Sequence, residues 1–283
     1  MKPIRRFMSR PVIRNIISRA WTGKMKILTK DYPDMGYSPN EIDSIDRVFV
    51  EQLDQLADKS LEIGLEIGTV LFYKDKKYRL SDKIVIGDEE EVKLDKVFMT
   101  VEKHEISEMI GDAHTHPGGL PIPSPPDIVE TAYSGLLLGR DEFLCITINK
   151  FPDMDLLVAL CIECIETLKK NMSKTFHDMK ESIDRLYSFL RSKLGPTYTR
   201  EEFFYEIVHE IVPDIDDLDH FIELGSQVIY FKERAIKELD TLYDKYWDPT
   251  DMYWFGLSDL LVDKFVINRY GDLIKIIRMK DLQ

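Results

Sequence analysis

The stretch EMIGDAHTHPGGLPIPSPPDIVETAYSGLLLG (108–139) predicts a strand, a loop and a helix in succession. The strand runs into His114 and His116, and a loop rich in proline and glycine follows. Ser124 and Asp127 enclose two prolines, which is typical of a helix start. A serine caps the first turn, prolines fit there, and an acidic group stabilises the positive end of the helix. The stretch therefore predicts an α/β fold in this part of the chain.

The same stretch carries the elements of a metal site. His114 and His116 are two residues apart, so on a strand both side chains point to one face and can bind one ion at about 2.0–2.1 Å from nitrogen. The loop can fold back and bring Asp127 to them as a third ligand. Two histidines and one carboxylate leave a fourth position open, which a catalytic zinc needs in order to bind water. Either half of the pattern alone is weak, but the combination indicates a metal site.

His114-Thr-His116-Pro117, followed by Ser124-x-x-Asp127, resembles the JAMM motif of the MPN/JAB-domain zinc metalloproteases. That family includes deubiquitinating enzymes of the proteasome lid and signalosome, and prokaryotic relatives that act on ubiquitin-like or sulfur-carrier proteins. The resemblance implies a mixed β-sheet flanked by helices, an α/β (α+β) fold. It also implies one catalytic Zn²⁺ on His114, His116 and Asp127, and a Ser124 hydroxyl that stabilises the oxyanion or positions the water.

The family also requires an upstream glutamate at the start of a strand. In LEIGLEIGTVLF (61–72) two residues qualify, Glu62 and Glu66. Glu66 fits better because glycine and an apolar strand follow it directly, although Thr69 stands where many relatives have a smaller apolar residue. The resemblance therefore makes Glu66 the general base, with Glu62 as the alternative.

Around the motif, hydrophobic periodicity and turn residues divide the chain into four parts. We expect a basic arm at 1–24, a JAMM/MPN-like domain at 25–165, a helical insertion or extension at 166–262, and a terminal hairpin at 263–283 that can rejoin the first sheet. In the domain we expect a strand at 25–30, a helix at 38–60, antiparallel strands across 66–105 and two strands across 142–163.

In the helical part we expect one helix along the apolar stripe from Leu168 to Leu194, one from a capping box at Thr199, one over 218–246 and a short one over 258–265. The stripe has three possible roles: packing on the sheet, forming a partner surface, or capping the active-site groove.

Charge and cysteine content narrow the function further. The first 30 residues contribute +9 to a formal net charge of −13, so the remainder carries −22. So acidic a body argues against nucleic acid as the main ligand. The basic arm has three interpretations: a solvated tail, a contact for a membrane or acidic partner, and a transit peptide. The three cysteines are interpreted as core residues rather than disulfides or zinc ligands, which fits the cytoplasm, and no transmembrane segment is expected.

The leading hypothesis is a zinc-dependent isopeptidase or peptidase that hydrolyses an amide bond at the C-terminal tail of a ubiquitin-like or sulfur-carrier protein. Glu66 then accepts a proton from the attacking water and delivers one to the leaving amine. The alternative is a non-catalytic MPN-type scaffold, although such scaffolds typically lack part of the motif. A DNA-associated function, suggested by a similar His-x-His-Pro loop in the wider superfamily, is disfavoured by the acidic body.

Overall fold

The computed structural model describes residues 47–88, 91–117, 123–151, 156–246, 262–268 and 275–278. The basic arm and the strand expected at 25–30 lie outside these residues. The helices are α5 (Arg47–Ile63), α6 (Leu94–Phe98), η2 (Ile106–Glu108), α7 (Pro125–Leu137), α8 (Cys164–Asn171), α9 (Ser173–Leu194), α10 (Arg200–Val208) and α11 (Leu218–Tyr246). The strands are β1 (Ile67–Lys74), β2 (Lys77–Ile86), β3 (Met109–Thr115), β4 (Leu144–Phe151), β5 (Leu156–Glu163), β6 (Val262–Asn268) and β7 (Lys275–Arg278).

The strands form one mixed sheet in the order β2-β1-β3-β4-β5-β6-β7. Among the described strands, β3 and β4 form the one parallel pair, and α7 connects them. The other described pairs are antiparallel. The expected α/β class with helices flanking a mixed sheet is therefore confirmed. Helices α8 to α11 lie in sequence between β5 and β6, which are neighbours in the sheet, so they are inserted between two paired strands.

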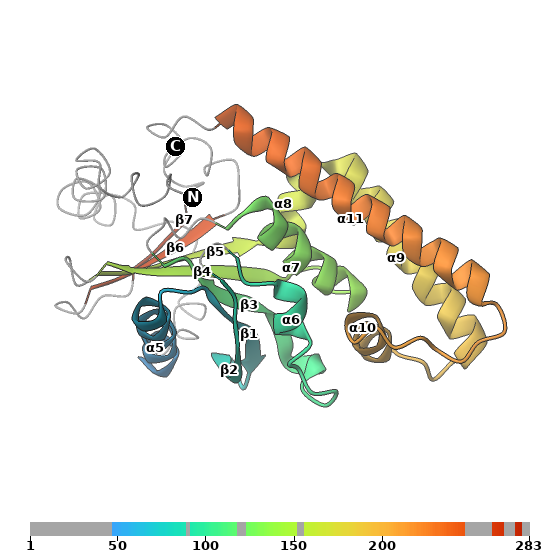
Figure 1. The fold of residues 1–283 in the computed structure, drawn as a ribbon, viewed down its shortest axis with the longest axis horizontal. Coiled ribbons are helices and arrows are strands. Elements are labelled where there is room, and N and C mark those ends of the chain that lie inside the picture. Colours follow the sequence, from blue (N-terminus) through green and yellow to red (C-terminus); the bar gives the residue numbers. More distant parts are fainter. Residues whose placement is uncertain are drawn as a thin grey trace.

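Two hydrophobic cores cover the two faces of the sheet. On one face α5 packs through Phe49 and Leu53 against residues of β1, β4 and β5. On the other face a larger core joins α6, α7 and α8 to the sheet and continues into α9, α10 and α11. Figure 1 shows α9 and α11 side by side, extending away from the sheet. The apolar stripe of α9 is buried in this larger core at Met179, Ile183, Leu186 and Leu190, whereas Leu194 at its end is exposed.

A β-bulge in β3 sets which side chains face which core. Leu71 of β1 pairs with Gly111, but Phe72 pairs with Met109, so Ile110 is the extra residue. Gly111 has φ +153°, and a Cβ there would lie 1.8 Å from the backbone oxygen of Leu144 on β4. Glycine is therefore required, because only it permits both this backbone conformation and this close approach.

Three expectations for secondary structure are wrong. Residues 94–98 form helix α6 rather than a strand, because Leu94, Val97 and Phe98 share one buried helical face. The single helix expected from Leu168 to Leu194 is broken at Met172, whose φ −141° and ψ 50° are not helical. The short helix expected over 258–265 is replaced, in its described part, by β6, because this segment pairs with the edge of β5.

Candidate metal centre

The three predicted ligands converge at the end of β3. His114 lies on β3, His116 follows the strand directly, and Asp127 lies in the first turn of α7. The main-chain N–H of His116 donates to Ile148 of β4, which holds the chain extended past the end of β3. His114 is fully buried, and the side chains of His116 and Asp127 are 15% and 13% exposed. His116 and Asp127 are therefore in partial contact with solvent, and His114 is not.

The spacing of the three groups fits a tetrahedral ion. The Nε2 atoms of His114 and His116 are 3.1 Å apart. Oδ2 of Asp127 lies 3.4 Å from Nε2 of His114 and 3.9 Å from Nε2 of His116. Ligands at about 2.0–2.1 Å from a tetrahedral zinc are about 3.3 Å from one another. The donor set and its spacing therefore fit Zn²⁺ without rearrangement of the backbone.

Without a metal ion, the two histidines interact favourably with the carboxylate of Asp127. Burial alone lowers the pKa of His114, but the charge of Asp127 and the hydrogen bond to Asp112 raise it well above its ordinary value. Burial acts in the opposite sense on Asp127, yet His114, His116 and Ser124 lower the pKa of its carboxyl. A proton on His114 thus compensates the negative charge of Asp127. A divalent cation has to displace that proton when it binds.

Ser124 and Asp127 form a reciprocal capping box at the start of α7. The main-chain N–H of Ser124 donates to Oδ2 of Asp127 at 2.6 Å, and the N–H of Asp127 donates to Oγ of Ser124 at 3.3 Å. The box fixes the carboxylate in place beside the histidines. Since Oγ of Ser124 accepts in this box, its own proton remains able to donate to an oxyanion.

Glu66 immediately precedes β1 and only 8% of it is exposed. Gly68 pairs with His114, and continuing this antiparallel register places Glu66 opposite His116. The main-chain N–H of Val92 donates to its Oε2 at 3.1 Å. Burial raises the pKa of Glu66 to about 7, with His114 opposing that shift and Asp127 adding to it. A carboxyl group with this pKa can exchange protons near neutral pH.

Glu62, the alternative base, lies in the last turn of α5 and is exposed. Its side chain faces solvent, whereas Glu66 is buried and interacts electrostatically with His114 and Asp127. The geometry therefore favours Glu66. The side chains of His104, His177 and His220 are exposed, and each lies within 4 Å of a glutamate carboxylate, so none of them belongs to the metal centre.

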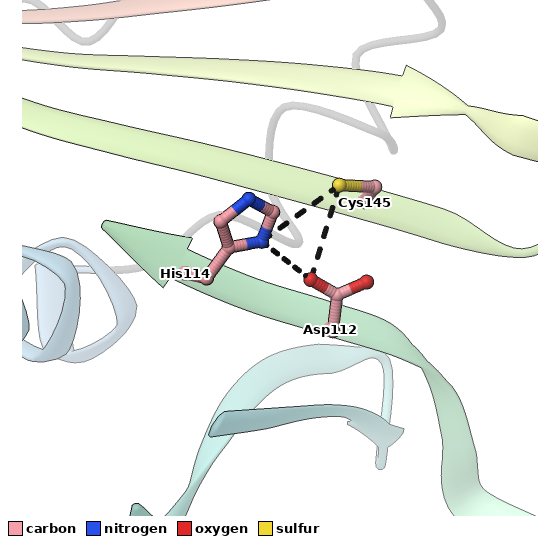
Figure 2. A group of neighbouring side chains, drawn as sticks. All are labelled: Asp112, His114 and Cys145. Atoms are coloured by element: carbon pink, nitrogen blue, oxygen red, sulfur yellow. Dashed lines mark hydrogen bonds and ion pairs between the residues drawn. The ribbon is translucent and has the colours of Figure 1, made fainter. Parts of the chain in front are cut away.

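A second group of potential ligands lies directly behind His114. Figure 2 shows Asp112 and His114 on β3 and Cys145 on the neighbouring strand β4. Nδ1 of His114 is 2.8 Å from Oδ2 of Asp112, and Sγ of Cys145 is 3.8 Å from that oxygen. Thr131 of α7 donates to the other oxygen, Oδ1, at 2.5 Å. All four side chains are buried.

This second group is unsuited to an ion of its own. Both oxygens of Asp112 already accept hydrogen bonds, from His114 and Thr131, and the Cys145 thiol donates to Oδ2. An ion at this position would have to displace all three bonds. The sequence prediction treats Cys145 as a core residue and overlooks Asp112, although Asp112 shares a strand face with His114 by the same two-residue spacing.

The inserted helices reach the metal centre through α11. Tyr243 donates from Oη to the main-chain oxygen of Pro123, one residue before the cap of α7, at 3.0 Å. One helical turn into α7, Lys232 forms a 2.8 Å ion pair with Glu130. The insertion thus packs along the helix that carries Asp127.

No protein-family model, curated protein or solved structure matches the chain.

Proposed function

We propose that this chain is a zinc-dependent isopeptidase or peptidase of the JAMM type. Its substrate is an amide bond at the C-terminal tail of a ubiquitin-like or sulfur-carrier protein. The observation that carries the proposal is the convergence of His114, His116 and Asp127 at tetrahedral ligand spacing, with the buried carboxyl of Glu66 beside them. The substrate class rests on the resemblance of the motif to that family.

Each residue has a role in the reaction. His114, His116 and Asp127 hold the zinc, which would supply Lewis-acid activation of a water molecule. Glu66 is placed to accept a proton from the water that would attack the carbonyl carbon, and to give a proton to the leaving amine. Its raised pKa suits both halves of that task. Ser124 donates its hydroxyl proton to the oxyanion that develops in the transition state.

We further propose a cytoplasmic location. Cys145, Cys161 and Cys164 are buried in the hydrophobic cores, which suits thiols in a reducing compartment. No helix in the part of the chain that the structure describes is long and apolar enough to cross a membrane. The acidic body supports a protein rather than nucleic acid as the main partner.

The test uses the full chain loaded with zinc and a ubiquitin-like protein fused through its C-terminal amide to a reporter. We expect Glu66→Gln to bind zinc as the wild type does but to lose about 10²- to 10⁴-fold in kcat, the contribution typical of a general acid–base. Glu62→Gln is the matched control, because it makes the same chemical change a few residues away at an exposed site.

Full activity of Glu66→Gln would contradict the proposed mechanism, and loss of activity only in Glu62→Gln would transfer the role of base to that residue. Zinc-loaded wild type that cleaves neither ubiquitin-like nor sulfur-carrier fusions would favour the scaffold alternative.

A further inference from the structure

The buried carboxyl of Asp112 has no part in the mechanism above, yet it contacts a proposed metal ligand directly. It is fully buried, and it lies on the same face of β3 as His114. An isolated buried carboxylate is costly, so its retention needs compensating partners. It has three: the imidazole of His114, the hydroxyl of Thr131 and, more weakly, the thiol of Cys145.

The hydrogen bonds to Thr131 and His114 restrict the Asp112 carboxyl to one orientation. Its Oδ1 accepts from Thr131 at 2.5 Å and its Oδ2 meets Nδ1 of His114 at 2.8 Å. Thr131 lies one turn after Asp127 on α7, so both side chains extend from the same face of that helix. The helix that supplies one predicted ligand therefore also fixes the group behind another.

We propose that Asp112 is a positioning residue for the metal centre: by accepting a hydrogen bond from Nδ1 of His114 it directs Nε2 of that imidazole, as the lone-pair donor, toward the zinc. This inference rests on the proposed function, since it assumes that the three convergent side chains hold zinc. Thr131 assists by holding the carboxylate in register. A neutral imidazole carries one N–H, and the acceptor beside Nδ1 decides which nitrogen bears it.

The position of His116 makes this direction necessary. Its Nε2 is only 3.1 Å from Nε2 of His114, so the two imidazoles approach the ion position through the same kind of nitrogen. If His114 carried its proton on Nε2 instead, that N–H would point into the ligand cluster and exclude the cation. Cys145, the other polar neighbour of Nδ1 at 4.0 Å, is too distant and too weak an acceptor to hold the tautomer.

The test measures zinc affinity of the full chain by competition with a chromogenic chelator. We expect Asp112→Ala to weaken zinc binding by about 10- to 100-fold, the range found when partners of metal-ligating histidines are removed. Asp112→Asn keeps an oxygen that can accept from Nδ1, so it should recover most of the affinity. Thr131→Val should shift the affinity in the same direction as Asp112→Ala, but less.

Two further measurements separate positioning from general damage to the fold. The visible absorption of the Co²⁺-loaded protein reports ligand geometry, and we expect it to change in Asp112→Ala and to be restored in Asp112→Asn. Ser182→Ala is the matched control, because Ser182 is a buried polar residue in α9 whose hydroxyl donates within its own helix to Met179. It should leave both zinc affinity and the Co²⁺ spectrum unchanged.

Equal zinc affinity and an unchanged Co²⁺ spectrum in Asp112→Ala and wild type would overturn the inference and leave the proposed function standing. Tight zinc binding by wild type without hydrolysis would overturn the proposed function and leave the inference standing. If Asp112→Ala fails to fold, Asp112→Asn and Thr131→Val decide: wild-type zinc affinity in Thr131→Val together with weakened binding in Asp112→Asn would show that the charge, and not the orientation of His114, matters.

Discussion

The two faces of strand β3 carry different kinds of side chain. The face toward α7 carries Asp112 and His114, whose polar atoms pair with each other and with Thr131. The face toward α5 carries Ala113, which packs in the smaller core, and Thr115, whose hydroxyl bonds to the main chain of Ile67 and to Ser60. One face therefore holds the atoms of the predicted metal centre, and the other connects that strand to its neighbours.

The α5 face also supports Glu66, the residue proposed as the general base. Thr115 accepts a hydrogen bond from the main-chain N–H of Ile67 at 2.9 Å and donates to Ser60 at 2.8 Å. Ser60 in turn donates to the main-chain oxygen of Leu65 at 2.7 Å. These bonds hold the residues on both sides of Glu66. The threonine between the two histidines thus ties the strand of the metal ligands to the residue proposed as base.

The largest loss of stability is expected at the bulge in β3, which determines which side chains lie on which face. Gly111→Ala places a Cβ within 1.8 Å of the Leu144 main-chain oxygen, at a backbone conformation that alanine rarely adopts. We expect a loss of about 4 kcal/mol or more in the free energy of unfolding, measured by urea denaturation. The control is Gly225→Ala in α11, where a Cβ meets no described atom within 4 Å and should stabilise by about 0.5–1 kcal/mol. Equal stability of the two variants would contradict the account of the bulge.

The next effect concerns the charge of Glu66 in the metal-free protein. Burial raises its pKa from 4.5 to about 7, so its contribution to stability is fully present below pH 4.5 and is lost as the pH rises through 7. Glutamine cannot ionise. Glu66→Gln should therefore be more stable than wild type at pH 8 by up to about 3 kcal/mol, with little difference at pH 5. Thermal unfolding of the metal-free proteins at both pH values measures this, and a pH-independent difference would show that Glu66 is not strained by its charge.

The smallest effects are expected when the same substitution, threonine to valine, is made on each face of β3. Thr115→Val and Thr131→Val each replace a buried hydroxyl by a methyl group, on the α5 face and beside Asp112 respectively. We expect Thr115→Val to cost about 1–2 kcal/mol of stability and to lower kcat while zinc affinity is unchanged, because only the support of Glu66 is lost. Thr131→Val should instead lower zinc affinity. Weakened zinc binding in Thr115→Val would remove the distinction between the faces.

The parts of the site that follow from the sequence are those set by local geometry. Alternation along a strand places His114 and His116 together, and a helix cap fixes Asp127, so a short motif suffices to predict them. The bulge at Gly111 depends on the approach of β4, and the bonds of Thr115 depend on α5, both distant in sequence. The same alternation places Asp112 on the face of the histidines and could have identified it. Its proposed positioning role, however, also depends on Thr131, which the packing of α7 brings to it.

In the fold, long periodic segments are predictable and short ones are not. Helix α11 occupies the expected residues 218–246, because its apolar stripe is long. Helix α6 has only five residues, too few for periodicity to distinguish it from a strand, and burial of Leu94, Val97 and Phe98 decides its form. The break at Met172 likewise follows from tertiary packing, since the side chain is buried in the core shared by α8 and α9.

We propose that His114, His116 and Asp127 together hold one zinc ion. The most direct measurement is the zinc content of the full-length chain after equilibrium dialysis against buffered Zn²⁺, compared with Asp127→Asn and with the exposed control Asp141→Asn. We expect one tightly bound zinc per chain in the wild type and in the control, and none at the same free zinc concentration in Asp127→Asn. A wild type that binds no zinc, or an Asp127→Asn variant that binds it equally well, would contradict the account.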